Sequence, residues 1–96
     1  MPKTDDIIQV LIVDDEEELV SALVERLNLR GFQATGVVRG EEALDFLGRE
    51  ECDVVLLDVK MPGLSGLDLI RRIKSDHPDL EVILLTGHGS KQDADQ

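Results

Sequence analysis

Basic residues are scarce in this 96-residue sequence. Its ten lysines and arginines are outnumbered by 21 aspartates and glutamates, so the formal net charge at pH 7 is −11. A surface with this balance repels the phosphates of nucleic acids and of anionic lipids. We therefore expect no direct contact with nucleic acid or membrane, and partners that are proteins or metal ions.

Cysteine and long apolar runs are rare as well. Cys52 is the single cysteine, which excludes an internal disulfide and a C-x-x-C metal site. The start of the chain lacks the apolar core and basic flank of a secretory signal, and no other run is long enough to cross a bilayer. These absences predict a cytoplasmic protein.

A composition of 42% hydrophobic and 32% charged residues suits one globular domain over residues 1–96.

Short apolar segments alternate with amphipathic ones along the chain. Segments rich in β-branched residues predict strands over 7–13, 33–38, 53–58 and 81–86. Apolar residues at helical spacing predict helices between them, on the repeats Leu19, Leu23 and Leu27, then 41–47, then Leu67, Ile70 and Ile73. Strands and helices in this alternation predict an α/β fold, with a parallel sheet covered by helices on both faces.

Polar side chains end three of the predicted strands. Asp14 and Asp15 follow the first, Asp58 ends the third and Thr86 ends the fourth. In open α/β sheets, ligands bind beyond the carboxyl ends of the strands, where the strand order reverses. We therefore expect these four residues to converge in one cleft.

Three converging carboxylates need a cation or a shared proton. At about 4 Å and an effective dielectric near 20, each pair repels by roughly 4 kcal/mol. Mg²⁺ is the expected cofactor, because it binds a few carboxylates and keeps positions open for water and phosphate oxygens. Asp58 is then placed to attack an in-line phosphorus and form an acyl phosphate, while the Thr86 hydroxyl donates to a phosphoryl oxygen.

Three motifs, VLIVDDE, VVLLDVKMPGLSG and VILLTGHG, occur in this order. Together they resemble the receiver domain of two-component response regulators over essentially the whole chain. The resemblance implies that Asp58 accepts a phosphoryl group from a sensor histidine kinase or phosphotransfer protein, as an acceptor rather than a turnover enzyme. It also implies that Asp14, Asp15 and the backbone carbonyl of Lys60 bind Mg²⁺ with Asp58, and that Thr86 is the switch hydroxyl.

The resemblance implies a flavodoxin-like, doubly wound sheet of strand order 2-1-3-4. The family's fifth strand and last helices are absent from residues 1–96, and with them the lysine that contacts the phosphoryl group. Lys60 and Lys91 do not replace it, because neither ends a fifth strand. We therefore expect a domain incomplete at its C-terminus, with the fourth strand as an edge open to homo-oligomerisation or segment exchange.

Other interpretations are open at this point. A haloacid-dehalogenase-like phosphatase also uses an aspartate after an apolar strand. Such a phosphatase has a D-x-D pattern, but the residue two after Asp58 is Lys60, which argues against this class. The second alternative is a receiver-like interaction or dimerisation module that is not phosphorylated, or an inactive fragment. The absence of the lysine that contacts the phosphoryl group favours this alternative. The retained aspartates and Thr86 favour the active type. Glu16 to Glu18 read as charges favoured at a helix N-terminus.

Overall fold

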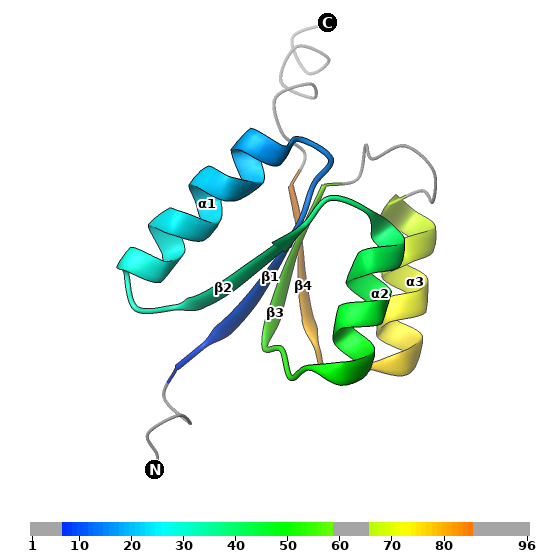
Figure 1. The fold of residues 1–96 in the computed structure, drawn as a ribbon. Helices are drawn as coiled ribbons and strands as arrows, with labels where there is room; N and C mark the ends of the chain where they lie inside the picture. The colour runs from blue at the N-terminus through cyan, green and yellow to red at the C-terminus, as the bar shows by residue number, and fades with distance from the viewer. Residues whose placement is uncertain (1–6, 59–65, 86–96) are drawn as a thin grey trace, which may run out of the picture.

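The computed structural model describes residues 7–58 and 66–85 (Figure 1). Strands and helices alternate along these residues, as the sequence predicts. None of the helices in the described part of the chain is long and apolar enough to span a membrane. The elements are β1 (Gln9–Val13), α1 (Glu17–Leu29), β2 (Gln33–Val37), α2 (Gly40–Arg49), β3 (Val54–Asp58), α3 (Gly66–Asp76) and β4 (Glu81–Leu85).

The sheet is parallel, and its strand order is β2-β1-β3-β4, which confirms the predicted order 2-1-3-4. The chain passes from β1 to β2 on one side and later to β3 on the other, so the order reverses at β1. In this register Val13 pairs with Val37 of β2 and with Leu57 of β3. The carboxyl ends of β1 and β3 therefore lie next to each other at the reversal.

Helices cover both faces of the sheet, with α1 on one face and α2 and α3 on the other (Figure 1). Successive side chains of a strand point to opposite faces, and the two cores follow this alternation. Even-numbered residues of β1 pack against α1 in a cluster of Val10, Ile12 and Val20. Odd-numbered residues of β1 and β3 pack against α2 and α3 in a cluster of Leu11, Val13, Ala43, Leu47, Val55, Leu57, Leu69, Ile73 and Leu80.

Two details of the predicted elements are wrong. The first strand begins at Gln9, and Ile7 is exposed, because neither neighbouring strand extends far enough to pair with it. On α3, Leu69 and Ile73 are buried while Leu67 is exposed. Of the predicted set, Ile73 is buried and Ile70 packs against the same core, so only Leu67 is misplaced. Leu69 takes its place, because residues four apart, such as Leu69 and Ile73, lie on one stripe of a helix.

The fourth strand is an outer strand of the described sheet. It pairs with β3 on one side, and Ile83 and Leu84 are exposed. Assembly or segment exchange through this edge stays a prediction.

Gly36 of β2 lies in close contact with α1. A methyl group added at Gly36 would overlap Cγ1 of Val20 and lie 3.1 Å from Cγ2 of Val24. We expect Gly36→Ala to destabilise the fold by about 1–3 kcal/mol, because the helix must shift to admit the methyl group. Thermal unfolding followed by far-UV circular dichroism measures the loss.

Gly48→Ala is the matched control for this substitution. A methyl group at Gly48 has no atom within 4 Å, and alanine favours the helical conformation of α2 over glycine. We expect the Tm of this variant to stay equal or rise. A Gly36→Ala variant as stable as the Gly48→Ala variant would contradict the close packing of α1 on β2.

Candidate metal centre

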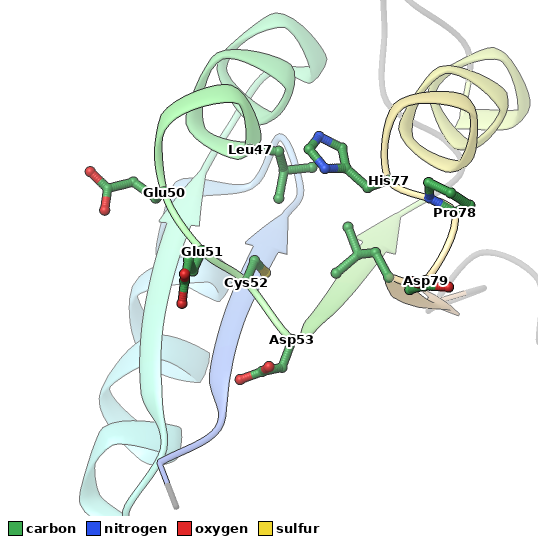
Figure 2. Close-up of a pocket in the computed structure, with 9 residues that line it drawn as sticks. Leu47, Glu50, Glu51, Cys52, Asp53, His77, Pro78 and Asp79 are labelled. Carbon is green, nitrogen blue, oxygen red and sulfur yellow. The ribbon is translucent and has the colours of Figure 1, made fainter. Parts of the chain in front are cut away.

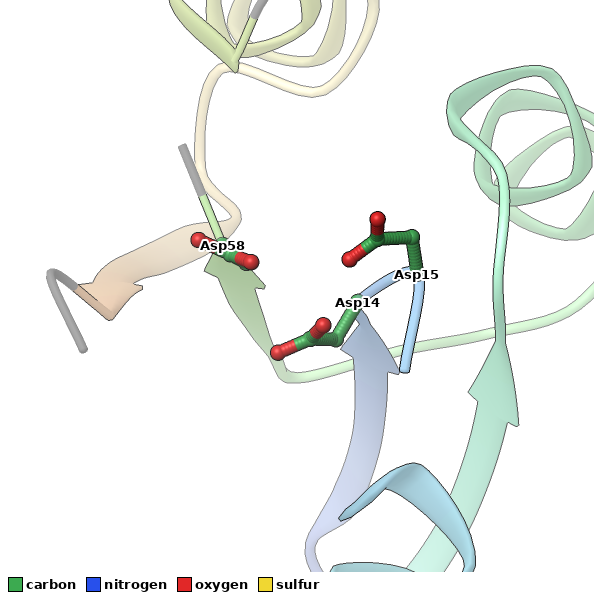
Figure 3. Close-up of side chains that lie close together, drawn as sticks. All are labelled: Asp14, Asp15 and Asp58. Atoms are coloured by element: carbon green, nitrogen blue, oxygen red, sulfur yellow. The ribbon is translucent and has the colours of Figure 1, made fainter. Parts of the chain in front are cut away.

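Three carboxylates gather at the carboxyl ends of β1 and β3 (Figure 3). Asp14 and Asp15 follow β1, and Asp58 is the last residue of β3. One oxygen from each of the three lies within 4.8 Å of the others. The register explains the approach of Asp14 to Asp58, because the residues before them, Val13 and Leu57, are paired in the sheet.

Asp14 and Asp58 are nearly inaccessible to water, with 2% and 8% of their surfaces exposed, whereas Asp15 is exposed. Backbone groups hold Asp14 at both its main chain and its side chain. The Asp14 N–H donates to the carbonyl of Val37 at 3.2 Å, and the Glu16 N–H donates to Asp14 Oδ1 at 3.0 Å. The cluster therefore has two buried carboxylates and one that faces solvent.

Burial raises the pKa of Asp14 above its ordinary value, because a charged carboxylate loses its hydration there. The negative charges of Asp58 and Asp15 raise this pKa further, and the hydrogen bond from the Glu16 N–H partly opposes the rise. The cluster thus favours an added positive charge, which either a proton or a metal ion supplies.

The raised pKa of Asp14 predicts that the free energy of unfolding depends on pH. The folded protein binds the Asp14 proton more tightly than the unfolded chain, so the stability from that proton is full below the unfolded pKa of about 4. It is lost as the pH rises through the raised pKa of Asp14. In metal-free buffer, we expect Asp14→Asn to remove this part of the pH dependence.

Urea unfolding of wild type and Asp14→Asn between pH 4 and pH 7 measures the difference. The free energy of unfolding of wild type, relative to the variant, is expected to fall as the pH rises. Parallel curves for the two proteins would contradict the raised pKa of Asp14.

The donor atoms of the cluster suit a hard divalent cation. Carboxylate oxygens are the ligands of Mg²⁺ and Ca²⁺, and Mg²⁺ is commonly bound through a small number of carboxylates with water in its other positions. The exposed side of Asp15 leaves room for such water. Asp14, Asp15 and Asp58 therefore fit a metal ion.

The other predicted site residues, Lys60 and Thr86, lie outside the described residues. Sequence reasoning also missed the Glu16 N–H, because it considered only the side-chain charge of that residue. Glu17 and Glu18 do lie in the first turn of α1, as expected for helix N-terminal charges, and Glu16 precedes that turn. An aspartate side chain often accepts a hydrogen bond from the backbone N–H two residues later, and this tendency was the signal available in the sequence.

A hollow of about 530 Å³ lies at the end of the sheet opposite the three carboxylates (Figure 2). Cys52 lines it, half-buried, and its thiol donates to the carbonyl of Val54 at a sulfur–oxygen distance of 3.3 Å. Burial raises the pKa of this thiol, so it stays protonated at neutral pH. Cys52 therefore packs as a small, protonated side chain at the entrance of β3.

Residues 10–96 match the response regulator receiver domain family. The chain belongs to this family. Its doubly wound sheet is the receiver fold, and the three carboxylates lie at the carboxyl edge of that fold. The chain is 37% identical over 81 residues to sporulation initiation phosphotransferase F of Bacillus subtilis, which covers 84% of this chain and 65% of the relative.

Solved receiver structures superpose well on the chain. The response regulator TrrA of Thermotoga maritima, in complex with Mg²⁺-BeF, is 34% identical with a TM-score of 0.80, over 91% of this chain and 76% of that one. A complex of the histidine kinase ThkA with TrrA matches with 36% identity and a TM-score of 0.78, over 86% of this chain and 73% of that one. The receiver chain spans between 17% and 65% of the length of three curated relatives.

Proposed function

We propose that Asp58 of this receiver domain accepts a phosphoryl group from a phosphohistidine of a sensor histidine kinase or phosphotransfer protein. The observation that carries the proposal is the convergence of Asp14, Asp15 and Asp58 within 4.8 Å at the end of β3. The kinase in the solved complex of ThkA with TrrA supports a partner of this class. The net charge of −11 supports a protein partner over nucleic acid or membrane. We further propose that the transfer takes place in the cytoplasm.

The transfer is an in-line displacement at phosphorus. A carboxylate oxygen of Asp58 forms the new P–O bond while the P–N bond of the donor histidine breaks. The imidazole nitrogen keeps the electron pair of that bond and takes one proton from solvent, which gives neutral histidine. Asp58 then carries the phosphoryl group as an acyl phosphate.

Asp14, Asp15 and Asp58 would hold Mg²⁺ together with the backbone carbonyl of Lys60. When bound, the ion would offset part of the negative charge of the three carboxylates and of the phosphoryl oxygens. Asp14, being buried, fixes one side of the site, and Asp15, being exposed, leaves the other side open to the donor. The Thr86 hydroxyl donates to a phosphoryl oxygen and so couples the modification to the segment after β4.

Intact-mass spectrometry tests the proposal. The purified chain is incubated with a small phosphoryl donor, such as acetyl phosphate, in the presence of Mg²⁺ and in parallel with EDTA. We expect a mass increase of one phosphoryl group with Mg²⁺ and none with EDTA. No increase under either condition would favour the receiver-like interaction module, which also gains no stability from the ion.

Asp15→Asn is expected to raise the Mg²⁺ concentration that gives half-maximal phosphorylation by about tenfold or more, since one charged ligand is lost. Mass spectrometry across a Mg²⁺ titration measures this shift. Asp45→Asn is the matched control, because Asp45 is exposed on α2 and the charge change is the same. Equal Mg²⁺ requirements in the two variants would remove Asp15 from the metal site.

A further inference from the structure

A backbone amide fixes one oxygen of Asp14. The N–H of Glu16 donates to Asp14 Oδ1 at 3.0 Å, and only 2% of Asp14 is exposed. Water therefore has little access to this carboxylate. The amide supplies a hydrogen bond that water supplies to an exposed carboxylate.

Neighbouring elements set the direction of this amide. On one side, the Asp14 N–H donates to the Val37 carbonyl of β2 at 3.2 Å. On the other, the Glu16 carbonyl accepts from the Val20 N–H of α1 at 3.0 Å. Glu16 itself is extended, with φ −91° and ψ 103°, as the residue that precedes the helix. The turn is thus anchored to both a strand and a helix.

We propose that the Glu16 backbone amide is a positioning group that holds Asp14 in the orientation for metal binding. The proposal rests on the proposed metal site. The like charges of Asp15 and Asp58 push the Asp14 carboxylate away from the cluster, and the amide opposes this displacement. Hydrogen-bond partners of metal ligands commonly contribute about 10–100-fold to metal affinity.

A side-chain substitution at position 16 keeps the N–H, so the test must change the main chain. An ester in place of the amide between Asp15 and Glu16 removes this one donor and keeps every side chain. The full chain is within reach of chemical synthesis, because Cys52 lies near its middle and serves as the ligation junction between peptides 1–51 and 52–96. A second synthetic chain carries the ester between Glu16 and Glu17 instead.

The ester at Glu17 is the matched control. It removes the Glu17 N–H and weakens the Glu16 carbonyl as the acceptor for the Val20 N–H, so it perturbs one anchor of the turn. It leaves the Glu16 N–H and its bond to Asp14 in place. Isothermal titration with Mg²⁺ alone measures affinity in the all-amide chain and both ester chains, and far-UV circular dichroism measures their fold. A phosphorylation assay across the same Mg²⁺ range accompanies them.

We expect the ester at Glu16 to lower Mg²⁺ affinity by about tenfold or more, and the ester at Glu17 to leave it within about twofold. We also expect the phosphorylation lost in the first chain to recover as Mg²⁺ is raised. Equal affinity in the two ester chains would overturn the proposal. So would unfolding of the Glu16 ester alone, since the amide would then support the fold rather than orient the ligand.

Failure of the proposed function has a different signature. An all-amide chain that binds no Mg²⁺ and accepts no phosphoryl group would overturn both the function and this inference. If the all-amide chain binds Mg²⁺ and is phosphorylated, and the Glu16 ester chain behaves identically, the inference alone is overturned.

Discussion

Asp58→Asn is expected to abolish phosphoryl acceptance. Asparagine has nearly the volume of aspartate, but its amide is not a nucleophile toward phosphorus. Because Asp58 is only 8% exposed and adjoins other carboxylates, removing its charge relieves repulsion and is expected to leave the fold intact. Intact-mass spectrometry is expected to show no added phosphoryl group at times when wild type is fully modified.

Asp53→Asn controls for the loss of one negative charge. Asp53 precedes β3 at the opposite end of the same strand, where its carboxylate accepts from the Gln9 N–H at 2.8 Å. An asparagine side-chain oxygen is able to accept the same bond, so this variant is expected to gain the phosphoryl mass. A mass increase that persists in Asp58→Asn would place the acceptor at another residue, and peptide mapping would then locate it.

Leu57→Ala is expected to destabilise the protein by about 2–5 kcal/mol. Leu57 is 0% exposed and belongs to the core cluster formed with α2 and α3, so its truncation leaves a cavity that packed neighbours fill only in part. Domains of this kind have total stabilities of about 5–15 kcal/mol, which makes the loss a large share. Since the sequence has no tryptophan or tyrosine, urea unfolding is followed by far-UV circular dichroism.

Leu84→Ala removes the same atoms from the neighbouring strand. Leu84 pairs with Leu57 in the sheet register, but 43% of it is exposed. We expect this variant to lose less than about 1 kcal/mol, since little apolar area returns to water. A loss as large as that of Leu57→Ala would show that β4 is covered in solution by another surface.

Local patterns predicted the order of elements and the site edge. Apolar runs of strand length and leucines at helical spacing are signals that short segments carry on their own. The convergence of Asp14 with Asp58 also followed, because in a parallel sheet the carboxyl ends of strands share an edge. The match of residues 10–96 to the receiver family confirms the resemblance that the three motifs suggest.

What the sequence did not predict depends on contacts between distant segments. The start of β1 at Gln9 is fixed by the length of its neighbouring strands, and the buried stripe of α3 by the side of the helix that meets the sheet. The packing role of Gly36 depends on the position of α1, which the segment 33–38 alone does not indicate. The orientation of Asp14 by the Glu16 amide likewise depends on main-chain geometry that side-chain patterns do not encode.

The position of β1 at the centre of the sheet also matters for biosynthesis. Both of its partners come later in the chain, and 45 residues separate Val13 from Asp58, the end of β3. At ordinary elongation rates, β3 is therefore completed about 2–9 s after β1. Throughout that interval β1, four of whose five residues are buried in the folded protein, has no partner strand on one side. Its apolar side chains are then open to capture by a chaperone.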